Sequence, residues 1–320
     1  MSSAEKIGQM LVAMAAFAVV FAVIMFLADR IKGRSADRVQ AAIFVVPALL
    51  LLTVGLVIPA IQTFYHSFKD ADSKDFVGFD NYHKVFSDST LLTVLGNTAL
   101  WVIIVPFFAT AIGLLYAIVI DKSRVEPFAK ALVFLPMAIS FVGASIIWRF
   151  VYAYKPSSRP QIGLLNEIFV KLGGSPQQFL INHPSNTFWL IVVMVWIQAG
   201  FAMTVLSAAI KAIPGDIIEA ARLDGVGAMG MFRFVTLPSI RPAAIVVLTT
   251  IAIGTLKVFD IVRTMTGGQF STSVVANEFY NQSFTISDAG VGSTLAVLLF
   301  VLVIPVVAYN VRQLRKADAR

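Results

Sequence analysis

Hydrophobic residues occupy long continuous runs along the chain, and short polar segments separate these runs. A helix needs about 20 apolar residues to cross the hydrocarbon core of a bilayer, and seven runs are long enough. The pattern predicts an all-α, polytopic membrane protein with about seven transmembrane helices, at Ile7–Ala28, Ala41–Phe64, Leu91–Ile120, Phe128–Tyr152, Phe188–Ile210, Ser239–Met265 and Val291–Val311.

The composition agrees with a lipid-facing surface. Hydrophobic residues make up 58% of the chain and charged residues only 13%, whereas soluble domains carry about 25% charged residues. The sequence has no cysteine, and its three histidines lie in polar loops without a metal-ligand partner three or four residues away. We therefore expect no metal site and no catalytic residues. No GxxxxGK[ST] motif occurs, so the chain has no P-loop of its own for ATP hydrolysis.

The basic residues predict the orientation of the spans. With the N-terminus outside, the segments that face the cytoplasm carry fifteen Lys and Arg residues and the outer segments carry seven. The positive-inside rule thus favours an outer N-terminus and a cytoplasmic C-terminus, and it explains the net charge of +7 better than nucleic-acid binding does. The first run is too long for a typical signal peptide, and a basic segment follows it at 30–38, so we interpret it as a retained helix.

One polar segment, EAARLDGVGAMGMFRFVTLP at 219–238, separates two uncharged runs. Asp216 is placed to cap a short helix, with Glu219 three residues later, close to a capping box. Asp224-Gly225 predicts a turn, because glycine adopts a positive φ at little cost. Leu237-Pro238 predicts the end of a second short helix, at an angle to the first. The alternative is an ordinary amphipathic loop on the lipid surface.

The sixth run carries charges inside its apolar stretch. Lys257 and Asp260 are three residues apart, which predicts that they share a helix face. An ionised group near the bilayer centre costs about 2.5–3.5 kcal/mol on insertion scales, so a partner or a water-filled cavity must offset that cost. One interpretation is a cavity lining that binds sugar hydroxyls, and the other is a structural ion pair between helices.

Aromatic and amide side chains are further candidates for a substrate path. Phe259, Trp196 and Phe201 are rings of a size to stack on a pyranose face, and Gln198 is a polar side chain in the middle of the fifth run. The alternative for Gln198 is an interhelical hydrogen bond.

The polar segment resembles the EAA signature of permease subunits of bacterial ATP-binding-cassette importers. That signature is EAA, three residues, Gly, and then a spaced I/V-x-LP, and the matching positions are Glu219, Ala220, Ala221, Gly225, Val235, Leu237 and Pro238. The stretches IPGDIIEAARLDG, FVGFDNYHKVF and FDIVRTMTGG are similar to the sugar-importer branch, and most to the larger permease of maltose and alpha-glucoside importers. The resemblance implies an N-terminal transmembrane helix with a basic cytoplasmic linker at 1–40, and a six-helix type I importer permease domain at 41–320.

The resemblance also implies roles for residues. In this family the polar segment is a coupling helix that docks on a separate ATPase subunit, and the corresponding positions are Asp216, Glu219, Ala220, Ala221, Asp224, Gly225, Leu237 and Pro238. Importers of this branch bind sugar through the fifth and sixth spans of this numbering, where the candidates are Gln198, Phe201, Lys257, Phe259 and Asp260.

Partners and location follow from the same resemblance. It implies a second permease subunit in a heterodimer, two ATPase subunits, an extracytoplasmic solute-binding protein and a sugar substrate. The chain is expected in the lipid of the bacterial inner membrane, without a cofactor of its own, because the ATPase partner binds ATP and Mg.

Three other functions remain open. A glycerol-phosphate or polyol importer shares much of the signature, and Lys257 and Arg263 would suit an anion, although Asp260 beside them favours a neutral sugar or polyol. A stand-alone secondary transporter is expected to carry charges in several spans, but apart from the sixth these spans are almost uncharged in their middles. A membrane enzyme needs converging catalytic groups, and the sequence shows no paired-aspartate motif or histidine cluster.

Overall fold

The computed structural model describes residues 3–30, 36–121 and 125–318. These residues are mostly helical, and the one β-bridge among them joins Lys69 to Phe76. The basic residues at 31–35, 122–124 and 320, which contribute to the predicted orientation, lie outside the described residues. The prediction of an all-α fold is confirmed.

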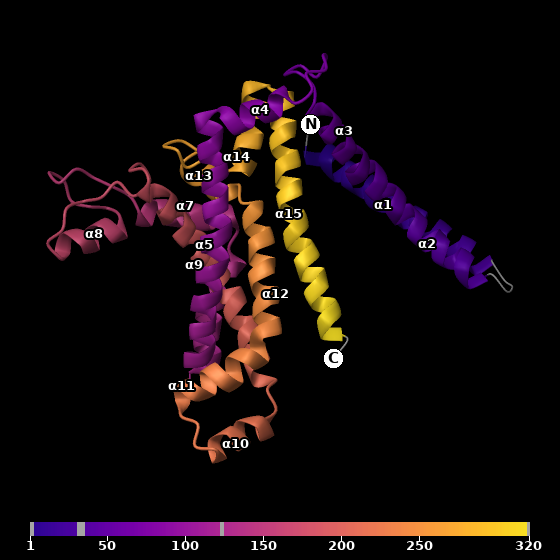
Figure 1. Cartoon of the computed structure of the whole chain (residues 1–320). Helices are drawn as coiled ribbons and strands as arrows, with labels where there is room; N and C mark the ends of the chain where they lie inside the picture. Colours follow the sequence, from indigo (N-terminus) through magenta and orange to yellow (C-terminus); the bar gives the residue numbers. More distant parts are fainter. Residues whose placement is uncertain (1–2, 31–35, 122–124, 319–320) are drawn as a thin grey trace. The chain divides into compact units, whose positions relative to one another are not determined.

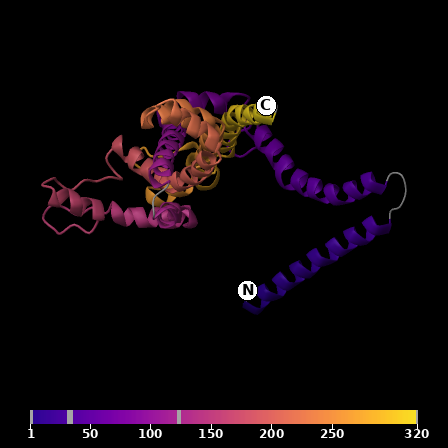
Figure 2. The ribbon, with the colours of Figure 1, turned by 90° about the horizontal axis from the view of Figure 1, so that it is seen from below.

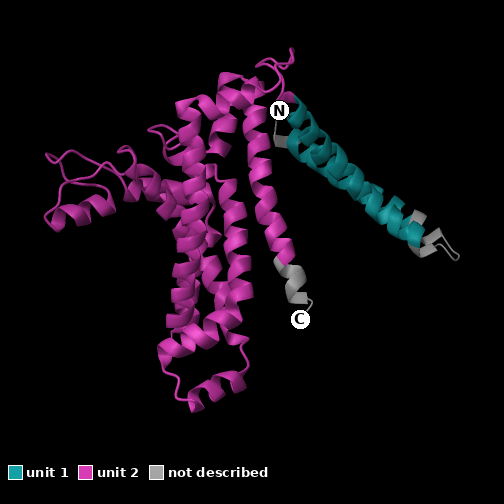
Figure 3. Cartoon of the chain, viewed as in Figure 1, with its two compact units in different colours: residues 1–65 teal, residues 66–320 magenta. Residues whose placement is uncertain are grey.

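The chain divides into two compact units, residues 1–65 and 66–320, which Figure 3 distinguishes by colour. The first unit contains two predicted spans, and its elements are α1 (Ser3–Arg30), α2 (Ala36–Leu52), the π-helical η1 (Thr53–Val57) and α3 (Ile58–His66), whose last residue belongs to the second unit. Within the unit α1 contacts α2. Large apolar side chains such as Phe17 and Leu51 are about three-quarters exposed, as suits a lipid-facing helix. The predicted domain boundary at residue 40 stays a prediction.

The second unit is a helical bundle with short helices at its ends (Figure 1). Its elements are α4 (Asp80–Ser87), α5 (Ser89–Ile120), α6 (Glu126–Phe134), the 3₁₀ turn η2 (Leu135–Ala138), α7 (Phe141–Val151), α8 (Leu164–Lys171), α9 (Ser185–Lys211), α10 (Gly215–Leu223), α11 (Ala228–Gly230), the π-helical η3 (Met231–Thr236), α12 (Leu237–Leu256), α13 (Asp260–Met265), α14 (Val275–Tyr280), the π-helical η4 (Asn281–Ile286) and α15 (Ala289–Asp318).

The core of this unit lies where α5, α9 and α12 pack together. Helix α5 begins at a cap, because the Asp88 carboxylate accepts hydrogen bonds from the backbone N–H groups of Thr90 and Leu91, at 2.8 and 3.0 Å. Gly113 lets α5 approach α9 closely, since a Cβ at this position would lie 2.5 Å from the Cβ of Ala202. The views in Figures 1 and 2 agree that α8 and its flanking loops project sideways from the bundle.

The fourth predicted span, Phe128–Tyr152, is not one straight helix. Its two halves, at 126–138 and 141–151, are bent by 103° against each other. The helix stops because Pro136 lacks a backbone donor, and α7 starts anew where the Ser140 hydroxyl accepts a hydrogen bond from the backbone N–H of Gly143 at 3.1 Å. The described residues contain six helices that are long and apolar enough to cross a membrane, or seven when this bent pair counts as one span.

The sixth predicted span, Ser239–Met265, is also interrupted. Helix α12 ends at Leu256, and α13 begins at Asp260. The prediction that Lys257 and Asp260 share a helix face is therefore wrong. Lys257 closes one helix with backbone bonds from its N–H to the carbonyls of Gly254 and Thr255, and Asp260 opens the next helix.

Candidate functional site

The end of α10 is a tight left-handed turn at Gly225. Its φ is +75°, a conformation that costs residues with a Cβ about 1–2 kcal/mol. The N–H of Val226 donates to the carbonyl of Ala221 at 3.1 Å, and the N–H of Gly225 donates to that of Arg222 at 3.0 Å. These two bonds define a Schellman motif. The predicted turn at Asp224-Gly225 is confirmed, and its geometry fixes the direction in which the chain leaves α10.

Helix α10 presents its side chains to the surroundings. All nine of its residues are described and none is buried, and Leu223 is 85% exposed. One open face of the helix is formed by Gly215, Asp216, Ile218, Glu219, Arg222 and Leu223. An exposed helix face with mixed apolar and charged side chains has the character of a docking surface.

Two local predictions about this segment are wrong. Pro214 is the N-cap of α10 and Asp216 lies inside its first turn, so Asp216 does not cap the helix. Leu237 and Pro238 do not end a helix, because α11, η3 and α12 form one continuous helical stretch from Ala228 to Leu256. The chain continues through Pro238 because its ring fits a helical φ and the preceding π turn shifts the hydrogen-bond register.

The predicted coupling residues therefore fall into two groups. Asp216, Glu219, Ala220 and Ala221 lie on α10, and Asp224 and Gly225 form its C-terminal turn. Leu237 and Pro238 lie apart from them, at the start of α12.

A second cavity lies between the α10 turn and the end of the bundle. It measures about 420 Å³ and is lined by Ile118, Asp121, Ile210, Arg222, Val226, Ala228, Met231, Phe232 and Thr236. Beside it, charged side chains join three helix ends: Glu126 accepts hydrogen bonds from Lys130 at 2.7 Å and from Lys211, and Lys211 is 3.7 Å from Asp121. The Lys130 ammonium also donates to the Ser207 hydroxyl.

The charged candidates of the sixth run lie at the break between α12 and α13. Within the described part of the chain no ion pair joins Lys257 to Asp260, so the structure does not support the structural-pair interpretation. Lys257 is exposed and Asp260 is half-buried. The ring of Phe259 lies 5.3 Å from that of Tyr280, over which the guanidinium of Arg263 sits at 4.7 Å in a cation–π contact.

The remaining path candidates lie on α9. Gln198 and Phe201 are both half-buried, and the Gln198 amide lies toward Gly254 of α12, about 4.0 Å from where a Cβ there would be. Gln198 thus lies at a helix–helix contact, where glycine leaves it room.

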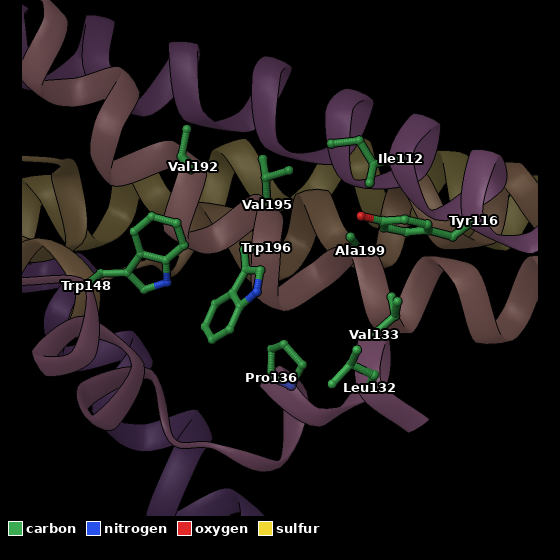
Figure 4. Close-up of a pocket in the computed structure, with 10 residues that line it drawn as sticks. All are labelled: Ile112, Tyr116, Leu132, Val133, Pro136, Trp148, Val192, Val195, Trp196 and Ala199. Carbon is green, nitrogen blue, oxygen red and sulfur yellow. The ribbon is translucent and has the colours of Figure 1, made fainter. Parts of the chain in front are cut away.

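An apolar pocket of about 380 Å³ opens where the broken fourth span faces α5 and α9 (Figure 4). Its lining residues are Ile112, Tyr116, Leu132, Val133, Pro136, Trp148, Val192, Val195, Trp196 and Ala199. The rings of Trp148 and Trp196 meet edge to face, with centroids 5.7 Å apart. Of the residues considered for sugar stacking, only Trp196 lines this pocket.

Trp148 and Tyr116 were not predicted as site residues. The neighbourhood of Trp148 depends on the bend that brings α7 against α9. Pro136 and Ser140 are the local signals of that bend, but they lie within a continuous apolar run that predicted one straight helix. The described residues contain no group of three or more His, Cys, Asp or Glu side chains arranged to hold a metal ion.

The family model for the binding-protein-dependent transport system inner membrane component matches residues 102–315. The chain is 47% identical over 275 residues to the osmoprotective compounds uptake permease protein GgtC of Synechocystis sp., covering 86% of this chain and 99% of that protein. It is 42% identical to the alpha-glucoside transport system permease protein AglF of Rhizobium meliloti, covering 87% of this chain and 83% of that one.

The fold is also similar to that of a solved structure. A chain of a bacterial ABC transporter involved in import of the acidic polysaccharide alginate superposes with a TM-score of 0.74, covering 88% of this chain and 96% of that one at 22% identity. At this identity the similarity supports the fold alone.

Proposed function

The chain belongs to the family of binding-protein-dependent transport system inner membrane components, and on this premise we propose that it is the permease subunit of an ATP-driven importer that moves a sugar or oligosaccharide, of the alpha-glucoside type, by alternating access. The observation that carries the proposal is helix α10 with its C-terminal turn. The helix is exposed, Gly225 sets the direction in which the chain leaves it, and the sequence contains no P-loop. An ATP-driven importer whose permease has no P-loop needs a separate ATPase, and in this proposal α10 is the surface on which it docks.

The α10 turn acts in this proposal as the coupling helix. Asp216 and Glu219 lie on its exposed face and present carboxylates to basic residues of the ATPase, while Ala220 and Ala221 permit close backbone approach. Asp224 and Gly225 fix the direction in which the chain leaves α10. Leu237 and Pro238 begin α12, the long helix that transmits a displacement of α10 into the membrane. A helix held by a Schellman motif transmits a displacement, whereas an unstructured loop absorbs it.

The substrate path follows the faces of α9, α12 and α13 that carry polar and aromatic groups. Gln198, Phe201, Phe259 and Asp260 are half-buried and Lys257 is exposed, which is the mixture that a hydrated sugar path needs. The Trp148–Trp196 pocket adds stacking faces beside it. The names of two relatives, which refer to alpha-glucosides and to trehalose and maltose, support a neutral sugar.

The proposed partners are a second permease, two ATPase subunits and an extracytoplasmic solute-binding protein. One structural neighbour is described as an alginate ABC transporter in complex with a pentasaccharide-bound periplasmic protein, which supports a binding-protein partner. The proposed location is the bacterial inner membrane, with the N-terminus outside, the C-terminus and α10 in the cytoplasm, and no cofactor held by this chain.

The proposal is tested by isolating the tagged chain from native membranes with a mild detergent and identifying the proteins that copurify. We expect a P-loop ATPase and a second permease, and the associated binding protein can then be screened against sugars. A chain that is recovered alone, under conditions that preserve other importers, would favour a stand-alone secondary transporter instead.

A Lys257→Ala variant tests the substrate path. Lys257 is exposed at the break and has no ion pair with Asp260, so we expect assembly with the partners to be unchanged and substrate-stimulated uptake to fall. Quantifying copurified subunits alongside uptake separates these effects. Loss of membrane insertion or of subunit association would assign Lys257 a structural role.

The same variant tests the second candidate function, a glycerol-phosphate or polyol importer. The exposed Lys257 and Arg263 favour an anion. The glycerol-phosphate function is the correct one if two results are obtained together. The wild type takes up an anionic substrate and no neutral glucoside, and Lys257→Ala loses the uptake of the anionic substrate.

A further inference from the structure

Glu126 is the centre of the charged cluster beside the α10 turn. Both Lys130, from the next turn of α6, and Lys211, from the last turn of α9, donate to the same carboxylate oxygen of Glu126. Asp121 at the end of α5 approaches Lys211 at 3.7 Å, and Ser207 of α9 accepts from Lys130. Glu126 thus joins α6 to α9, and Lys211 in turn joins both to the end of α5 through Asp121.

The burial of this cluster separates it from ordinary surface pairs. The side chains of Glu126 and Asp121 are 19% and 15% exposed, whereas the side chain of Lys211, which pairs with both, is 51% exposed. Exposed pairs contribute little because water screens them and long side chains lose entropy, but a partly buried carboxylate that loses its cations is left uncompensated. By contrast, the pair Glu167–Lys171 on α8 has the same four-residue spacing and is largely exposed.

The cluster lies on the connection between α10 and the bundle. Lys211 is the last residue of α9, and α10 begins at Gly215. The cavity of about 420 Å³ separates the α10 turn from Ile118, Asp121 and Ile210 of the bundle. Helix α10 has no buried residue and contacts η3, so a displacement of α10 reaches the bundle through η3 and through the connection to α9, which is held at Lys211.

On its other side the cluster leads to the apolar pocket. Glu126 is the first residue of α6, which continues into η2. Leu132, Val133 and Pro136 of this stretch line the pocket that contains Trp148 and Trp196. The stretch also follows α9 closely, because a Cβ on Gly200 would lie 2.5 Å from the carbonyl oxygen of Val133.

We propose that Glu126 is a positioning residue that couples the stem of α10 to the broken fourth span, so that a displacement at Lys211 moves α6 and reshapes the Trp148–Trp196 pocket. The inference rests on the proposed function, because it presumes that an ATPase displaces α10. It assigns no contact with substrate or nucleotide to Glu126.

The experiment uses the purified importer complex, in vesicles, and measures sugar uptake per ATP hydrolysed. Glu126→Gln keeps the size of the side chain and removes its charge, and Lys211→Gln removes its interhelical partner. We expect each variant to assemble and to hydrolyse ATP, with uptake per ATP lowered about fivefold or more. The double variant should lose no more than either single variant, because both remove the same link. Lys211→Arg, which keeps the charge, should retain coupling.

Glu167→Gln is the matched control, since it breaks the exposed pair with the same spacing, and we expect no change in uptake per ATP. Normal coupling in Glu126→Gln overturns the proposal. A fall of ATP hydrolysis and uptake in proportion to the amount of assembled complex also overturns it, because Glu126 is then only structural. Failure of the proposed function is recognised separately, because no ATPase would then copurify with the wild-type chain.

Discussion

A double variant, Glu219→Lys with Gly225→Pro, should abolish sugar uptake while the chain still inserts in the membrane. Glu219 lies on the exposed face of α10, where reversing its charge changes only what docks there. Gly225 has a φ of +75°, whereas proline is restricted to a φ near −65°, so the Schellman motif cannot form and α10 loses its direction. Both changes leave the buried core untouched. We therefore expect background uptake together with wild-type amounts of chain in the membrane fraction.

A matched control is available at a second Schellman turn, at Gly173. Gly173, with a φ of +86°, ends α8 with the same pair of bonds, from Gly174 to Phe169 and from Gly173 to Val170. A Glu167→Lys, Gly173→Pro variant should disturb α8 and leave ATPase binding intact. Normal uptake by the Glu219→Lys, Gly225→Pro variant would remove the coupling role from α10.

Gly113→Ala should strongly destabilise the second unit. The added Cβ would lie 2.5 Å from the Cβ of Ala202 and 2.7 Å from the backbone N of Met203, so α5 and α9 must separate. Overpacking of a dense core typically costs about 1–3 kcal/mol, and here the obstruction includes backbone, which cannot change rotamer. The measurement is the temperature at which the detergent-solubilised protein loses its monodisperse peak.

Gly96→Ala provides the comparison within the same helix. A Cβ at Gly96 meets nothing within 4 Å, and alanine is favoured over glycine in a helix by about 1 kcal/mol. We expect this variant to be as stable as the wild type or slightly more stable. Equal behaviour of the two variants would show that the close approach of α5 to α9 is not needed for stability.

The apolar runs predicted the spans well because length and hydropathy decide membrane crossing, and the segments at Ile7–Ala28 and Phe188–Ile210 needed no further information. The two interruptions, at Ile139–Ser140 and at Lys257–Phe259, were not predicted. Around Ile139 and Ser140 the apolar run continues, so the break in the backbone leaves no gap in the hydrophobic pattern. At the second break the charged residues Lys257 and Asp260 are spaced as on one face of a continuous helix, and this spacing concealed the break. Pro136 signals the first break locally, but the sequence around Lys257 contains no proline or helix-ending glycine.

The candidate site shows the same limit. The turn at Gly225 was predictable because positive φ depends on the residue itself. The contact between Glu126 and Lys211 spans 85 residues and depends on how α6 and α9 pack, and the neighbourhood of Trp148 and Trp196 depends on the 103° bend. Periodicity within one segment carries no information about either pairing.

The π-helical turn η3, between α11 and α12, amounts to one residue inserted into a helix. Such a turn absorbs the additional residue, so deleting a single residue from Met231–Thr236 would let the stretch continue as an α-helix and would leave α11 at nearly the same azimuth about the axis of α12. A residue deleted from the α-helical part of the stretch, at Leu237–Leu256, has no such turn to absorb it and would rotate everything before it by about 100°. The azimuth at which Glu219 faces a partner is therefore insensitive to the loss of one residue from η3 and sensitive to the same loss from α12. Relatives that dock the same way should differ in length at η3 more readily than within α12.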